Sequence, residues 1–103
     1  MTIDDLRKKL QETFDALDEA GVDDRGSRDL HILLLQLQQQ LAVAAFDPLK
    51  ELDGVTIADT SRLAGLCAEV QNVIDDENRR IQLVERIVAT GKIALRAAGI
   101  PIP

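Results

Sequence analysis

Apolar residues recur every three or four positions along the first twenty residues, which is the spacing of one face of a helix. These residues are Ile3, Leu6, Leu10, Phe14 and Leu17. Thr2 precedes the first of them as a helix cap, and Gly21 follows the last as a stop signal. The pattern therefore predicts a helix over about 3–20.

A second apolar segment predicts a helix over about 28–46, which ends before Pro48. Ser27 or Asp29 can cap its start. Proline disfavours helical backbone in the residue before it, and it is well suited to the first position of a new helix. The sequence therefore predicts a short helix over 48–52 directly after the second one.

From 57 to 98 no proline interrupts a helical pattern, so the sequence predicts one long helix over 57–98. Residues seven apart form a mostly apolar row, which consists of Leu63, Val70, Glu77, Val84, Gly91 and Ala98. Such a row is typical of a coiled-coil or hairpin seam, and the helix would be about 60 Å long. The predicted fold is all-α: an elongated helical hairpin with a long C-terminal helix plus an N-terminal helix, forming a single domain over 1–98 with an extended tail over 99–103.

Both main helices carry apolar residues on more than one face. The main stripe of the second helix consists of Leu30, Leu33, Leu34, Leu37, Leu41 and Ala44. A nearly opposite stripe consists of Ile32, Leu35, Val43 and Phe46, while Leu83, Ile87 and Ile93 lie off the seam of the long helix. A two-helix hairpin covers only one side of each helix. We therefore expect a homo-oligomer with an interface formed by Ile32, Leu35, Val43, Phe46, Leu83 and Ile87.

Composition and charge narrow the possible functions. The 103 residues are 46% hydrophobic and carry a formal charge of −6. Residues 1–24 hold eight acids and three bases, whereas residues 79–103 hold five bases and one acid. No apolar run approaches the ~20 residues that span a bilayer, and no signal peptide is recognisable. Together with the single cysteine, these features predict a cytoplasmic protein with no membrane partner.

The residues that could carry chemistry favour structural roles. His31 is the only histidine, and Cys67 lies on an apolar helix face. The acidic run at 75–77 can form helical ion pairs with Arg79 and Arg80, which favours a solvated helix face over a metal site. We therefore expect no catalytic residue, no metal and no cofactor, so the protein is predicted not to be an enzyme.

Two further features have a possible binding role. The basic residues near the end are Arg79, Arg80, Arg86, Lys92 and Arg96. They either offset the helix dipole or bind DNA weakly and without sequence preference, because the chain lacks Trp and Tyr for base stacking. The tail residues Ile100, Pro101, Ile102 and Pro103 either form an extended peptide for a partner, are frayed, or fold back as a hydrophobic cap.

The layout resembles the oligomerisation core of small terminase subunits from tailed phages and gene transfer agents. The resemblance involves the hairpin, the stretch FDPLKEL at 46–52, and the long helix that continues through ENRR at 77–80. It implies a ring that binds packaging DNA and recruits the large terminase subunit through a terminal segment. Many such proteins begin with a helix-turn-helix, but residues 1–27 form one acidic helix and a turn, which puts specific DNA recognition in doubt.

The chain also resembles flagellar and secretion-type export chaperones. These are small, acidic helical hairpins, and residues 78–98 are similar to their terminal helix. This alternative implies a monomer or dimer that holds a helical segment of an export substrate on an open apolar face. A ring distinguishes the first family from the second.

Overall fold

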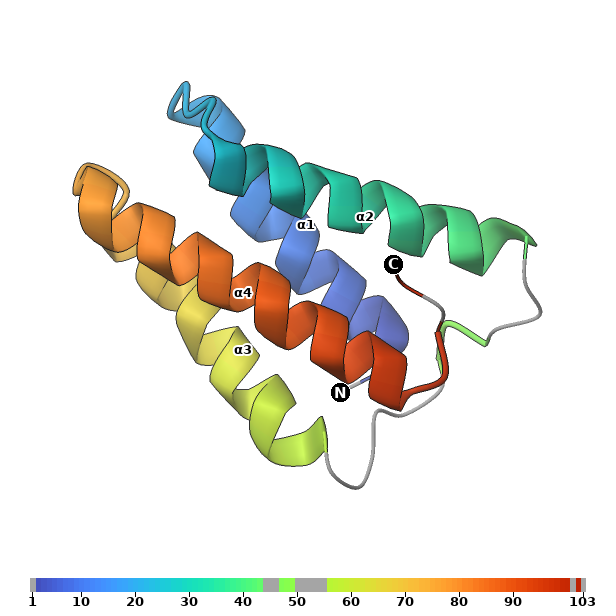
Figure 1. Cartoon of the computed structure of the whole chain (residues 1–103). Coiled ribbons are helices and arrows are strands. Elements are labelled where there is room, and N and C mark those ends of the chain that lie inside the picture. Colours follow the sequence, from blue (N-terminus) through green and yellow to red (C-terminus); the bar gives the residue numbers. More distant parts are fainter. Residues whose placement is uncertain (1, 44–46, 50–55, 101, 103) are drawn as a thin grey trace.

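Four helices make up the part of the chain that the computed structural model describes, which comprises residues 2–43, 47–49, 56–100 and 102 (Figure 1). They are α1 (Ile3–Glu19), α2 (Arg25–Val43), α3 (Thr56–Asn72) and α4 (Glu77–Ala97). The all-α prediction is confirmed, and the first helix lies where the sequence placed it.

The helices form a compact bundle rather than the predicted elongated hairpin. α1 packs against α2 and α3, and α4 packs against the same two helices, so each helix has two neighbours (Figure 1). The bundle measures 38 × 26 × 19 Å and has a radius of gyration of 13.0 Å. A helix of about 60 Å does not fit these dimensions.

The prediction of one helix over 57–98 is wrong because the chain turns at 73–76. The N–H groups of Val73 and Asp76 donate to carbonyl groups three residues earlier, at Val70 and Val73. Asp76 then caps α4, since its carboxylate accepts a hydrogen bond of 3.3 Å from the N–H of Arg79. Asp76 therefore acts at a helix start, where acids are favourable, and not in the expected ion pair.

Local capping also explains where α1 ends and α2 begins. Gly21, with a φ of 74°, follows α1, and the N–H of Val22 donates to the carbonyl of Leu17 at 3.0 Å. This is a Schellman motif, which satisfies the last carbonyl groups of a helix. Asp24 accepts a hydrogen bond of 2.9 Å from the N–H of Ser27, so Asp24 caps α2, and not Ser27 or Asp29 as predicted.

The region after α2 is only partly described. Residues 44–46 and 50–52 lie outside the described residues, so the ends of the predicted helices over 28–46 and 48–52 do too. The carboxylate of Asp47 accepts a hydrogen bond from the N–H of Leu49 at 2.9 Å. The carbonyl of Pro48 accepts one from the N–H of Asp4 at 2.8 Å, which fixes this turn beside the start of α1.

The core runs through the centre of the bundle and takes side chains from all four helices. Its aliphatic members include Leu6, Leu10, Leu30, Leu33, Leu37, Leu63, Val70, Val84, Ile87 and Leu95. Leu83 and Ile87 are buried, so their prediction as interface residues is wrong. The physical reason is that α4 contacts two helices and buries a wider arc of its surface than a helix in a hairpin does.

Candidate functional site

The outer face of α2 carries two large aliphatic side chains in solvent. Ile32 is 51% exposed and Leu35 is 52% exposed, although the opposite side of α2 lies in the core. We call the exposed positions of the last three turns the α2 outer face, which consists of His31, Ile32, Leu35, Gln38, Gln39 and Ala42. The structure thus places Ile32 and Leu35, two members of the predicted second stripe of α2, on the surface.

The α2 outer face differs from the exposed face of α1 in having no charge. No Asp, Glu, Lys or Arg occurs in α2 after Asp29. In α1, by contrast, every exposed position bears a charge: Asp5, Lys8, Lys9, Glu12, Asp15, Asp18 and Glu19. A surface depleted of charge that exposes branched aliphatic side chains is typical of the centre of a protein interface.

His31 and Gln38 form the edge of this face toward α1. The imidazole ring of His31 stacks on Phe14, with ring centroids 4.6 Å apart and an angle of 15° between the planes. The amide of Gln38 donates to Gln11 at 3.5 Å. His31 is therefore an exposed residue that covers an aromatic side chain. Of the other interface predictions, Phe46 lies outside the described residues, and so does the side chain of Val43.

The predicted DNA-contacting residues separate into two groups. Arg80 and Arg96 are engaged by other parts of the fold: the half-buried Arg80 forms an ion pair of 3.2 Å with Asp24, and the exposed Arg96 donates to the carbonyl of Ile102 at 3.1 Å. Arg79 and Arg86 are exposed, and Lys92 is half-buried. The five residues therefore do not form one continuous basic surface.

Arg79 and Arg86 line a groove between α3 and α4. One hollow of about 320 Å³ is lined by Arg62, Leu66, Arg86, Ala89 and Thr90. A second hollow of about 150 Å³ is lined by Glu69, Arg79, Gln82, Leu83 and Arg86. We call these two hollows, which share Arg86, the α3–α4 groove. Arg62 was missed from the sequence because the groove exists only when α3 folds back along α4.

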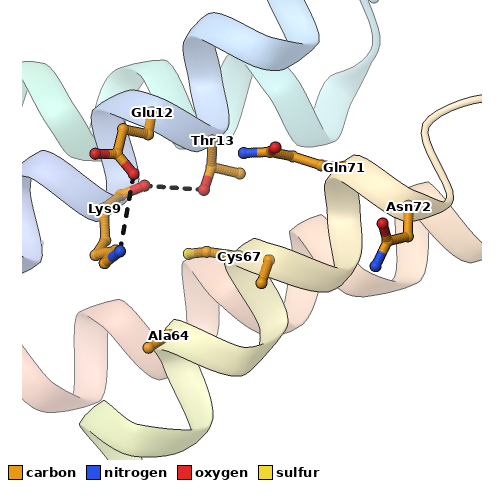
Figure 2. A pocket seen from close by; sticks show the side chains of 8 residues that line it. Lys9, Glu12, Thr13, Ala64, Cys67, Gln71 and Asn72 are labelled. Atoms are coloured by element: carbon orange, nitrogen blue, oxygen red, sulfur yellow. Dashed lines mark hydrogen bonds and ion pairs between the residues drawn. The ribbon is translucent and has the colours of Figure 1, made fainter.

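Cys67 lies in a cavity of about 300 Å³ between α1 and α3 (Figure 2). The hydroxyl of Thr13 points toward the same cavity and donates to the carbonyl of Lys9 at 2.9 Å. Burial raises the pKa of the Cys67 thiol, while the nearby Thr13 hydroxyl acts in the opposite direction. The thiol is therefore protonated at neutral pH, which does not favour a nucleophile.

The tail is packed against the fold. Ile100 and Ile102 are buried, and they belong to the core cluster. Gly99 has a φ of 85°, and the N–H of Ile100 donates to the carbonyl of Leu95 at 3.0 Å, which forms a second Schellman motif. The structure thus has the hydrophobic-cap arrangement and not a free docking peptide. Pro101 and Pro103 lie outside the described residues.

Comparisons with protein-family models, with curated proteins and with solved structures found no match for the chain. Within the described ranges, no three His, Cys, Asp or Glu side chains gather in a way that could hold a metal ion. In the same part of the chain, every helix is too short or too polar to cross a bilayer. Two surfaces have features of a binding site: the α2 outer face, which exposes Ile32 and Leu35, and the α3–α4 groove, which is lined by Arg79 and Arg86.

Proposed function

We propose that this chain is a non-enzymatic helical protein that associates with a second copy of itself through the α2 outer face. The observation that carries the proposal is the pair Ile32 and Leu35, which are half-exposed on a helix face without charge. Exposed apolar area is a drive to associate, at about 25 cal/mol per Å² removed from water. The partner is a second copy of the chain, because the α2 outer face is complementary to itself.

Two copies of α2 fit together when the helices run antiparallel. A two-fold axis midway between Ile32 and Leu35 places Ile32 of one copy beside Leu35 of the other. The same axis places Arg28 beside Gln39, so no like charges meet. A parallel pair would instead place Arg28 beside Arg28, which is unfavourable. The antiparallel pair gives an apolar centre with a polar rim, as in known interfaces.

The chemistry of the described residues supports a non-enzymatic role. His31 stacks on Phe14, and the thiol of Cys67 is buried with a raised pKa. Neither group is arranged as an activated base or nucleophile. DNA packaging is not part of the proposal, because the elongated hairpin behind the resemblance to small terminase subunits is replaced by a compact bundle.

The experiment is sedimentation equilibrium over a range from about 5 to 500 µM, since an interface of one helix per copy is small and the dimer should be weak. The wild-type mass should rise from the chain mass of 11.3 kDa toward twice that value. Ile32→Asp and Leu35→Asp should keep the mass of the monomer at every concentration, because a carboxylate would be buried without a partner.

Ile93→Asp is the matched control. Ile93 is 57% exposed on α4, so it has a similar exposure on a different helix, and its variant should associate as the wild type does. A wild type that stays monomeric at 500 µM contradicts the proposal. Equal behaviour of the Ile32 and Ile93 variants would mean that another surface mediates association.

A further inference from the structure

The α3–α4 groove combines an apolar hollow with arginines along its length. Leu66 and Ala89 contribute apolar side chains to the larger hollow, whereas Leu83 lines the smaller hollow, is almost fully buried and leaves that hollow mostly polar. Arg62, Arg79 and Arg86 surround the two hollows, and Arg86 belongs to both. The groove is therefore both apolar and cationic, unlike the α2 outer face, which is uncharged.

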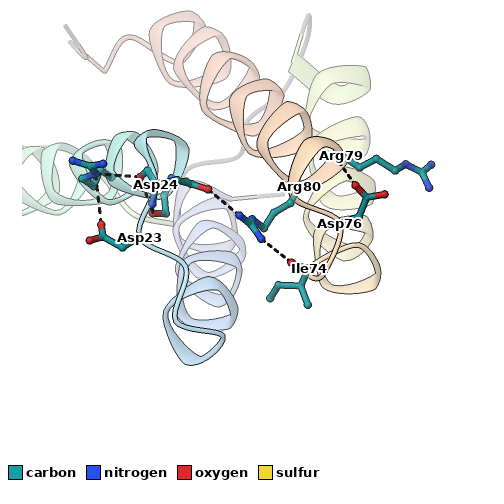
Figure 3. Close-up of polar contacts among 8 residues, drawn as sticks. Asp23, Asp24, Ile74, Asp76, Arg79 and Arg80 are labelled. Atoms are coloured by element: carbon teal, nitrogen blue, oxygen red, sulfur yellow. Dashed lines mark hydrogen bonds and ion pairs between the residues drawn. The ribbon is translucent and has the colours of Figure 1, made fainter.

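Two arginines of α4, Arg79 and Arg86, are exposed to solvent on the same side of the helix. Arg79 and Arg86 lie seven residues apart, so they project from the same side of α4 and are separated by about 10 Å along the helix axis. With the residues that the structure describes, neither forms an ion pair within 4.0 Å. Figure 3 shows Arg79 pointing away from Arg80, which is directed toward Asp24.

These features fit a protein helix better than a nucleic acid. Glu69 lines the smaller hollow, and its carboxylate would repel the regularly spaced charges of a phosphate backbone, whereas a helix can present an uncharged residue at that point. The chain as a whole carries a charge of −6 and has no Trp or Tyr on which a base could stack. An amphipathic helix, by contrast, can place an apolar side chain in the larger hollow and its acids beside the arginines.

We propose that the α3–α4 groove binds an acidic amphipathic helix of a partner protein. A small or branched aliphatic side chain of that helix occupies the larger hollow, and two of its acids, seven residues apart, pair with Arg79 and Arg86. Such charge pairs set the orientation and the rate of binding, while the apolar contacts contribute most of the affinity. This inference does not rest on the pairing of α2, which is a different surface.

The test uses the full chain and a fluorescent helical peptide of 21 residues. The probe carries Leu along one face and Glu seven residues apart beside that face, and a matched probe carries Lys in place of Glu. Fluorescence anisotropy at low salt should show binding of the acidic probe at micromolar concentrations and none of the basic probe. Binding should weaken with added salt, since the ion pairs are exposed.

The double variant Arg79→Glu, Arg86→Glu should lose at least tenfold in affinity for the acidic probe. The matched control is Lys8→Glu, Arg25→Glu, which changes the net charge equally at exposed positions of α1 and α2 and should bind within twofold of the wild type. Amide NMR signals of 62–69 and 79–93 should shift on binding, whereas those of 31–42 should not.

Three results would overturn the inference. One is the absence of binding of the acidic probe at 200 µM. Another is equal affinity of the wild type and the Arg79, Arg86 double variant. The third is displacement of the probe by a 20-base-pair DNA duplex at lower concentration than the unlabelled peptide needs, which would make the groove a nucleic-acid surface.

Discussion

Arg80 and Asp24 are joined by an ion pair of 3.2 Å although they lie 56 residues apart in the sequence (Figure 3). The other amino group of the same guanidinium donates to the carbonyl of Ile74 at 2.9 Å. Asp24 also caps α2 through the N–H of Ser27. Arg80 therefore holds together the α1–α2 turn and the α3–α4 turn, which form one end of the bundle.

The first prediction concerns Asp24. Burial alone would raise the pKa of its carboxyl, but the hydrogen bonds from Ser27 and Arg80 and the charge of Arg80 outweigh burial and hold the pKa below the usual value of an aspartate. A lowered folded-state pKa stabilises the protein above the unfolded pKa of about 3.9, and the stabilisation is lost as the pH falls through the folded value. Asp24→Asn should therefore reduce the free energy of unfolding by about 2 kcal/mol at pH 6, and the difference should shrink below pH 4.

Urea denaturation at several pH values measures this effect. Asp23→Asn is the control, since Asp23 is exposed and its oxygen lies 3.6 Å from Arg28 in a surface pair. It should change the free energy of unfolding by less than about 0.5 kcal/mol at any pH. An Asp24→Asn variant whose deficit is the same at pH 6 and pH 2.5 would contradict the proposed linkage.

The turn between α3 and α4, which Arg80 stabilises, was not predicted from the sequence, since the local pattern indicated one helix over 57–98. The run Asp75, Asp76 and Glu77 has two local interpretations, because acids can pair with arginines four residues later or can cap a new helix. The choice depends on burial: only the second lets α3 fold back and pack Leu63 and Val70 into the core. That packing involves distant residues, so it is not visible in the local pattern.

A second prediction compares two glycines inside helices. A Cβ atom on Gly91 would lie 3.3 Å from Cδ2 of Leu33, so α4 packs tightly against α2 at this position. Gly91→Val should therefore overpack the core and reduce the free energy of unfolding by about 1–3 kcal/mol. Around Gly65, no atom of the described residues outside its own stretch of helix lies within 4 Å of such a Cβ, so Gly65→Ala should instead stabilise the protein by about 0.5–1 kcal/mol.

Thermal denaturation measures both effects: the melting temperature should fall for Gly91→Val and rise for Gly65→Ala. Each variant is a control for the other, since both glycines lie within helices and differ mainly in what surrounds them. Two stabilised variants would show that α4 can move away from α2 at little cost.

The third prediction uses Cys67 as a probe of local opening. Its thiol is buried and its pKa is raised by that burial, so little thiolate is available. Modification by an aromatic disulfide reagent at pH 8 should be at least about 100-fold slower in the folded protein than in urea. The double variant Cys67→Ala, Ala68→Cys moves the thiol by one residue to an exposed position, and it should react at nearly the unfolded rate. Similar rates for the two folded proteins would mean that α1 and α3 separate frequently.

The candidate surfaces could be predicted from the sequence only in part. The exposed stripe of α2 could be predicted, because the helical spacing of its residues shows which positions lie opposite the core. Ile32 and Leu35 occupy such positions. Leu83 and Ile87 follow the same rule on α4 but are buried, because the number of neighbours of a helix decides how wide its apolar arc is. Arg62 carries no local signal, since its partners in the groove lie on another helix.

The last prediction concerns the tail. Ile100 and Ile102 are buried, Gly99 allows the reversal of the chain after α4, and Arg96 donates to the carbonyl of Ile102. Deleting residues 100–103 should therefore reduce the free energy of unfolding by about 3 kcal/mol and lower the melting temperature by roughly 10–20 °C, because two isoleucine side chains lose their burial. Gly99→Ala keeps both isoleucines but strains the backbone, so it should cost only about 1 kcal/mol. A deletion variant that melts with the wild type would instead mean that the isoleucines contribute little to the core and that the tail is available to a partner.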